Sequence, residues 1–417
     1  MNKQQFFSLS DKFKDWVNYM EESGIDIDLT EVEKVLLKNI QSFSQKFSVI
    51  ENEPDDYEKI LEQCPTIPKV DEYPQDYESK IRGAVIGRFA GCTLGAPVEG
   101  WQIDAMVNYA QLLNMEFPPK NYWKDVINRE NIQYEASKRY EFTESEMDGV
   151  PADDDVMYPL LNMLLVEKYG KDFTIDDMGK HWLDNMTVCC TAEYEALENL
   201  KKGVPAEKCA EGNPYVEWIG AAIRADLYGY ICPGDPLKAA KMAYNDAYLS
   251  HRRTGIYGEM YFAAVIASAF TAKSIKDALL EGLKVIPENC RLAQDIKWAI
   301  EYAPNVKDYK QAREAVDKRF PGMFWVHTRN NTCLVIFALL LAEDNYTKLI
   351  SECVAMGHDN DCTTATAGSI FGAFYGIEKI DKKWYEKFNN KIKCFLQHDK
   401  FFQIEDVINR ITKLSKI

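Results

Sequence analysis

The sequence predicts an all-α protein, and three observations support this prediction. Apolar residues recur at three- and four-residue spacing, as in residues 158–165 and 260–267, which is the period of a helix that buries one face. Two-residue alternation, typical of half-buried strands, is scarce. Turn signals, such as those at residues 203–205 and 233–236, separate the helical stretches.

Residues 1–78 are predicted to form an N-terminal helical extension. Charged helical patterns cover residues 4–22, 29–50 and 55–62. Three prolines within residues 65–74 then mark a connecting segment. We therefore expect the main domain to begin after this segment.

The main predicted domain, residues 79–417, begins with a helix that carries a row of glycines and ends before Pro97. A second row with the same four-residue spacing lies near the other end of the chain. Glycine inside a helix costs about 1 kcal/mol relative to alanine, and the usual return is close backbone approach. We therefore expect the two helices to meet, although packing alone would also explain each row. The glycines are Gly83, Gly87, Gly91 and Gly95 in the first row, and Gly368, Gly372 and Gly376 in the second. Two further helices, at residues 382–398 and 403–416, are expected to complete the domain.

The composition of the 417 residues limits the function. The chain has 49 Lys and Arg against 65 Asp and Glu, a net charge of −16 that opposes broad contact with nucleic acid or anionic membranes. Eleven cysteines without a Cys-x-x-Cys pattern favour reduced thiols over disulfides or structural zinc. No apolar run reaches the roughly 20 residues of a membrane span. A cytoplasmic protein is expected.

Two aspartate clusters, at residues 153–155 and 359–361, each precede an apolar helical stretch. Carboxylates favour helix N-termini, which is sufficient to explain either cluster alone. Together they would supply five carboxylates, a ligand set that suits hard divalent ions such as Mg²⁺, Mn²⁺ or Ca²⁺. Five charges without metal would repel or take up protons, whereas two divalent ions would cancel four of them. The candidate ligands are Asp153, Asp154, Asp155, Asp359 and Asp361.

These motifs resemble the ADP-ribosylglycohydrolase family over residues 81–376, the motif-bearing core. The resemblance includes the helix ending Gly95-Ala96-Pro97-Val98-Glu99-Gly100, the three aspartates at 153–155, and the Gly-x-Asp-x-Asp stretch with its following glycines. It implies an orthogonal helical bundle of this family's type, with a binuclear Mg²⁺ site for which Mn²⁺ is the alternative. It also implies hydrolysis of the bond at ribose C1 of an ADP-ribosylated protein or small molecule.

Site residues follow from the same resemblance. Glu99 matches a glutamate that activates water or closes over the substrate, and Asp359 is the second expected catalytic carboxylate. The expected substrate-binding residues are Gly95, Arg224, His251 and His358. A buried ion pair is the alternative for Arg224, and a structural role is the alternative for either histidine.

The chain also departs from the family pattern. Many members of the family have a threonine followed by a pair of aspartates at the first cluster. The pair here is either Asp153-Asp154 or Asp154-Asp155. We favour Asp154-Asp155, because Asp153 then replaces the threonine and still offers an oxygen ligand. At the second cluster, Cys362 replaces a threonine. A thiol is a poor Mg²⁺ ligand, so Thr363 replaces it as a ligand, water completes the shell, or one metal binds weakly. The alternative functions are a nucleoside or nucleotide N-glycosidase and a non-catalytic ADP-ribose-binding protein.

Overall fold

The computed structural model describes residues 3–23, 28–47 and 53–417. The chain divides into two compact units, Met1–Ile50 and Glu51–Ile417. In the first unit, α1 spans Lys3–Glu22 and α2 spans Thr30–Phe47. Both helices confirm the predicted helical patterns, apart from residues 48–50, which lie outside the described ranges.

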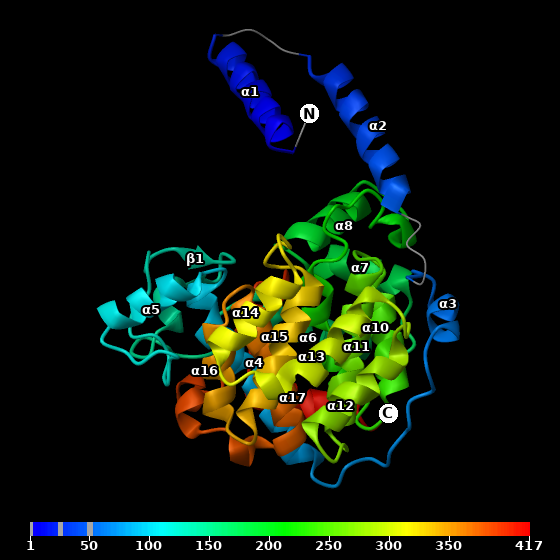
Figure 1. The fold of residues 1–417 in the computed structure, drawn as a ribbon. Helices are drawn as coiled ribbons and strands as arrows, with labels where there is room; N and C mark the ends of the chain where they lie inside the picture. The colour runs from blue at the N-terminus through cyan, green and yellow to red at the C-terminus, as the bar shows by residue number, and fades with distance from the viewer. Residues whose placement is uncertain (1–2, 24–27, 48–52) are drawn as a thin grey trace. The chain divides into compact units, whose positions relative to one another are not determined.

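The larger unit is a bundle of helices (Figure 1), which confirms the predicted all-α class. Only two short strand pairs interrupt it among residues 53–417: β1 (Ile132–Gln133) with β2 (Ser137–Lys138), and β3 (Ile392–Lys393) with β4 (Phe401–Phe402). Its helices are α3 Tyr57–Glu62, α4 Tyr77–Gly95, α5 Ile103–Leu112, α6 Asp154–Tyr169, α7 Ile175–Asn185, α8 Thr191–Lys201, α9 Asp226–Ile231, α10 Pro236–Ala247, α11 Thr254–Ala269, α12 Ile275–Gly282, α13 Arg291–Tyr302, α14 Tyr309–Arg319, α15 Thr328–Ala342, α16 Tyr346–Ala355, α17 Asn360–Tyr375 and α18 Ile404–Leu414.

The two glycine-lined helices, α4 and α17, pack against each other in antiparallel directions, as predicted. A Cβ atom added to any of the four α4 glycines would overlap the backbone of α17 or of the residues that follow it. Side chains at these positions would therefore force the helices apart. The contacts are Gly83 with Gly372 and Gly376, Gly87 with Gly368, Gly91 with Thr364, and Gly95 with Asp361.

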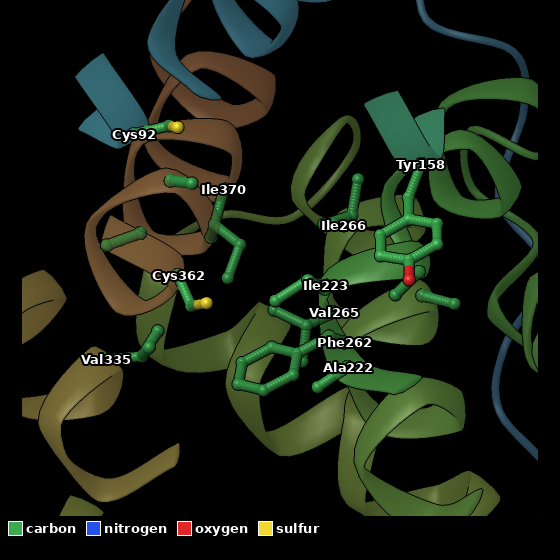
Figure 2. Packing of buried hydrophobic residues seen from close by; sticks show 14 of the residues in the cluster. Cys92, Tyr158, Ala222, Ile223, Phe262, Val265, Ile266, Val335, Cys362 and Ile370 are labelled. Atoms are coloured by element: carbon green, nitrogen blue, oxygen red, sulfur yellow. The ribbon is translucent and has the colours of Figure 1, made fainter. Parts of the chain in front are cut away.

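The core of the bundle lies around α11, in which every residue is buried. Figure 2 shows part of this apolar packing, including Phe262 and Val265 of α11 and Ile370 of α17. Tyr257 and Phe371 are completely buried, as expected of core residues. The pattern of three- and four-residue spacing was therefore a correct guide to the helices that form the core.

The segment that follows the first unit packs on the bundle. Ile60 of α3 is completely buried, and Glu53 forms an ion pair of 2.6 Å with Arg291 at the start of α13. These contacts join residues 53–76 to the larger unit. The domain division at residue 78 stays a prediction.

One predicted helix is wrong. Residues 382–398 form two short 3₁₀ turns, Lys382–Trp384 and Glu386–Phe388, followed by strand β3. Asn389 and Asn390 adopt left-handed backbone conformations, with φ of 47° and 55°, and this interrupts any helix. The last predicted helix is confirmed by α18. Among the described helices, none has the length and apolar character needed to cross a membrane.

Candidate metal centre and active site

The two aspartate clusters meet at the N-terminal ends of α6 and α17. Asp153 is the N-cap of α6, and Asp359 is the N-cap of α17. Asp361 joins the two ends, because its carboxylate belongs to two sets of possible ligand atoms. One set also contains Glu99 and Asp359, the other Asp155 and Cys362, and the atoms of each set lie within 4.8 Å of one another.

The packing of α4 on α17 brings Glu99 to this cluster. Gly95, the last residue of α4, lies against the backbone of Asp361, and a Cβ atom there would overlap it. The chain then makes one 3₁₀ turn, Ala96–Val98, and reaches Glu99. Gly95 therefore acts through close packing, and its predicted contact with substrate stays a prediction.

Several carboxylate oxygens of the cluster are buried and have no hydrogen-bond partner. They are Oδ2 of Asp155, Oδ1 of Asp359 and Oδ1 of Asp361, on residues that are at most 3% exposed. Burying an unpaired carboxylate oxygen is costly, because water no longer solvates it. Cations bound in the two sets that share Asp361 could satisfy these oxygens, so the residues fit a divalent metal centre.

The only arginine that contacts these aspartates within residues 53–417 is Arg88. Its Nη2 lies 2.7 Å from Oδ1 of Asp155, and its Nη1 lies 2.7 Å from Oδ2 of Asp226, so two carboxylates share its single charge. This leaves most of the cluster's negative charge uncompensated. Arg88 was not predicted from the sequence, although an arginine in the buried, apolar part of α4 is a signal for a buried ion pair.

The crowding of carboxylates changes their protonation. Burial, with the charges of neighbouring carboxylates, raises the pKa values of Asp153, Asp155 and Asp359 well above their usual range. Burial raises the pKa of Asp361 to about 6. The charge of Asp361 is also the largest cause of the raised pKa of Glu99, whose side chain reaches the surface. Without a cation, the cluster therefore holds protons near neutral pH.

A short hairpin, β1–β2, lies beside the first aspartate cluster. The Gln133 side chain donates a hydrogen bond of 3.3 Å to Oδ2 of Asp153, and Ser137 Oγ accepts one of 2.8 Å from the backbone of Ala152. Tyr134 lies near Asp154, and its ring stacks on that of Phe395 with the ring centroids 4.6 Å apart. No local motif in the sequence pointed to these hairpin residues, because their position depends on long-range packing.

The residues after Asp361 point in different directions. The Cys362 sulfur faces Asp155 and Asp361. Thr363 instead lies beside the thiol of Cys353 in α16, and its buried hydroxyl has no hydrogen-bond acceptor. A ligand role for Thr363 stays a prediction, and this orientation favours Cys362 for the position.

Arg224 and His251 lie in a second ionic cluster, where both are completely buried. Arg224 forms ion pairs with Glu193, Asp246 and Glu259. Its guanidinium group is therefore occupied within the chain, as the alternative of a buried ion pair predicted. The role of either residue in substrate binding stays a prediction that this burial does not favour.

His358 precedes Asp359 in the chain and lines a cavity of about 350 Å³. Its Nε2 lies 3.3 Å from Asp317, and its carbonyl accepts a hydrogen bond of 3.0 Å from the backbone of Gly100. Trp325 and Gln102 line the same cavity. His358 is thus the predicted substrate-binding residue best placed to meet a ligand at the cluster.

His327 precedes an apolar helical stretch, and its position in the sequence suits either ligand binding or a cap for that helix. Its ring accepts a hydrogen bond of 3.2 Å from the backbone of Arg329 at the start of α15. The capping prediction is therefore confirmed.

An all-α bundle with buried carboxylates gathered at the ends of two helices is a scaffold that can hold divalent metal ions. The sequence model of the ADP-ribosylglycohydrolase family matches residues 73–415, and the chain belongs to that family. This confirms the resemblance inferred from the motifs. The protein is accordingly a glycosidase-type hydrolase, and its family is metal-dependent.

A comparison with solved structures also finds similar chains. A solved structure described as an "ADP-ribosylglycohydrolase-related protein complex" is similar to this chain with 18% sequence identity and a TM-score of 0.49. The similarity covers 82% of this chain and 99% of that one. No curated protein matches the sequence significantly.

Proposed function

We propose that the protein removes ADP-ribose from a modified side chain or small molecule, by hydrolysing the glycosidic bond at ribose C1 with two bound divalent ions, Mg²⁺ or Mn²⁺. The observation that carries the proposal is the set of Glu99, Asp359 and Asp361, whose carboxylate oxygens lie within 4.8 Å of one another. Glu99 is exposed, whereas the two aspartates are buried with unpartnered oxygens. Substrate and water can therefore approach from the side of Glu99, and the ions would be held beneath.

When bound, the two ions would balance the carboxylate charge, hold the ribose hydroxyls and acidify a water molecule. The proposed ligands are Asp153, Asp154, Asp155, Asp359 and Asp361. In the first cluster, Asp154 and Asp155 are the proposed pair, with Asp153 in the threonine position.

Glu99 is the proposed general base. It accepts a proton from the attacking water while the water oxygen forms a bond to C1. The bond from C1 to the leaving group breaks, and the leaving group keeps the electron pair and takes up a proton from solvent. Its position suits this role, because Glu99 is exposed while one of its carboxylate oxygens lies within 4.8 Å of oxygens of Asp359 and Asp361. Asp359 would stabilise the positive charge that develops on the ribose ring.

The substrate would extend from this centre towards His358 and the cavity lined by Trp325. The first candidate for the bond is the N-glycosidic linkage to an arginine side chain. We further propose that the enzyme acts in the cytoplasm and binds neither nucleic acid nor membranes, since the net charge of −16 opposes both.

The test is a substrate panel of ADP-ribosyl-arginine, ADP-ribosyl-serine and plain nucleosides, assayed with Mg²⁺ or Mn²⁺. Asp361→Asn should lower turnover about a hundredfold or more with the fold retained, because it removes a carboxylate shared by both ligand sets. Asp344→Asn, which changes an exposed aspartate paired with Lys379, is the matched control and should leave turnover unchanged.

The other outcomes separate the alternatives. Cleavage of nucleosides but not of ADP-ribosylated substrates would identify a nucleoside or nucleotide N-glycosidase. The substitution at Cys362 motivates the second alternative. Binding of ADP-ribose without turnover of any ribosyl substrate would identify a non-catalytic binding protein and contradict the proposal.

A further inference from the structure

One side chain of the acidic cluster differs chemically from the others. Cys362 lies in the first turn of α17, and only 7% of the residue is exposed. Its sulfur and one carboxylate oxygen from each of Asp155 and Asp361 lie within 4.8 Å of one another. One cation among these atoms can contact a sulfur and two oxygens.

The two aspartates of this set each have an unsatisfied oxygen. Oδ2 of Asp155 and Oδ1 of Asp361 have no hydrogen-bond partner, and the residues are 0% and 3% exposed. The second oxygen of Asp155 accepts a hydrogen bond of 2.7 Å from Arg88. The two oxygens without a partner are available to bind a cation. The thiol of Cys362 therefore belongs to a set of side chains that still has free ligand atoms.

A second thiol offers an internal comparison. Cys92, on α4, also lies within 4.8 Å of carboxylate oxygens, those of Asp153 and Asp155. However, both oxygens of Asp153 have partners, one at 3.1 Å from the backbone N of Asp155 and one at 3.3 Å from Gln133. Figure 2 shows Cys92 on α4 and Cys362 on α17 among the buried residues. Both aspartates of the Cys362 set therefore have an unsatisfied oxygen, whereas in the Cys92 set only the shared Asp155 has one.

We infer that Cys362 binds one of the two divalent ions as a thiolate, and that this half of the centre prefers thiophilic ions such as Zn²⁺, Fe²⁺ or Cd²⁺ over Mg²⁺. Thiolate ligands select softer metals, whereas sets of carboxylates alone suit Mg²⁺ and Mn²⁺. Asp359 and Asp361, beside the proposed base Glu99, belong to the all-oxygen half, and Asp361 belongs to both halves. The inference rests on the metal centre of the proposed function.

The test uses the full chain, stripped of metal by a chelator and titrated with Co²⁺ and Cd²⁺. The wild-type protein should develop a near-ultraviolet charge-transfer band from thiolate to metal. Cys362→Thr should lose this band and lose Cd²⁺ affinity relative to Mg²⁺ by on the order of 10- to 100-fold, the range known for weakened metal sites. Cys92→Ala, the matched control, should keep both. Cys362→Ser provides a second variant with an oxygen ligand, and circular dichroism checks that each protein is folded.

Three results would overturn the inference: Co²⁺ binding without the band in the wild type, a band that survives in both Cys362 variants, or a band lost in Cys92→Ala instead. The substrate panel keeps the two proposals apart. Turnover with Mg²⁺ in a protein that shows no band overturns the thiolate ligand and leaves the hydrolase proposal intact. A band in a protein that cleaves no ribosyl substrate supports the ligand and contradicts the hydrolase.

Discussion

Two buried groups of carboxylates lie in the larger unit, and they are neutralised in different ways. Around Arg224, a fully buried guanidinium group contacts three carboxylates, including Asp246 at 2.8 Å. At the ends of α6 and α17, Arg88 reaches only Asp155 of the cluster and shares its charge with Asp226. Arg224 contacts every carboxylate of the first group, whereas Arg88 contacts only one aspartate of the second.

The pKa values of the carboxylates also differ between the two groups. Burial raises the pKa of Glu193 to about 7, although Arg224 opposes the rise. Burial also raises the pKa of Glu259, so a proton on each glutamate and the charge of Arg224 can together balance the three carboxylates. In the second group, burial raises the pKa values of several neighbouring aspartates together, and the charges of adjacent carboxylates raise them further. The first group is therefore paired within the chain and stabilises the fold, whereas the second group is suited to bind a cation from solution.

Removing the internal cation should have the largest effect on stability. Arg224→Met is expected to lower the free energy of unfolding by about 3–5 kcal/mol, because it leaves buried carboxylates without a partner. Urea denaturation followed by circular dichroism measures the change. A loss below about 1 kcal/mol would show that protons alone neutralise the first group.

The acidic centre should respond to pH in the metal-free protein. The pKa of Asp361 is raised to about 6, so its protonated form is favoured in the folded state. Its contribution to stability is present below about pH 4, near the unfolded pKa, and is lost as the pH rises through about 6. The expected loss is on the order of 2–3 kcal/mol. Denaturation of the chelated protein between these pH values measures it, and Asp361→Asn should flatten the profile.

Metal addition should reverse this loss. A divalent ion at a hundred times its dissociation constant is expected to stabilise the folded protein by about 2.7 kcal/mol, since it binds the folded state selectively. Thermal unfolding at pH 7 with and without Mn²⁺ tests this. Asp361→Asn should remove most of the shift, while Arg410→Met should keep it. An equal shift in the Asp361 variant would contradict the metal centre.

The contact between α4 and α17 sets the geometry of the second group. Gly87→Ala should cost about 1–3 kcal/mol, because its Cβ atom would overlap the carbonyl of Gly368. Glu78→Ala, at an exposed position of α4, is the control and should change little. Urea denaturation compares the two variants. A neutral Gly87→Ala would mean that the helices separate without cost.

An arginine at the surface should matter least. Arg410 lies on α18 and pairs with Glu167, and both side chains are partly exposed. Arg410→Met is expected to change the free energy of unfolding by less than about 1 kcal/mol, since water screens the pair. Denaturation measured beside Arg224→Met gives a direct comparison of one substitution in two environments. Similar losses would remove the distinction between buried and exposed pairs.

Much of the fold could be predicted from local pattern. Helical spacing identified the core helices, and the glycine rows identified α4 and α17 as partners. The prediction for residues 382–398 failed, because an amphipathic composition also suits short turns when Asn389 and Asn390 adopt left-handed conformations. Such backbone choices depend on neighbouring segments more than on the residues themselves.

The acidic centre was only partly predictable. The aspartates at residues 153–155 and 359–361 stand out in the sequence because each cluster precedes an apolar helical stretch. Burying unpaired carboxylates costs free energy, so such clusters indicate a bound cation. Arg88 and the β1–β2 hairpin did not stand out, since neither carries a pattern that refers to the distant clusters. The sequence shows that Cys362 replaces a threonine of the family pattern. Which of Cys362 and Thr363 points towards the aspartates depends on how α17 packs in the fold.

The sequence by itself determined the helical class, the close contact of α4 with α17, and the residue types available to bind a metal. These follow from spacing and composition, which act over a few residues along the chain. Only the tertiary structure decided that Arg224 is occupied internally, that Asp361 is shared between two ligand sets, and that Cys362 faces Asp155. Charges act through space, so their pairing depends on which segments pack together.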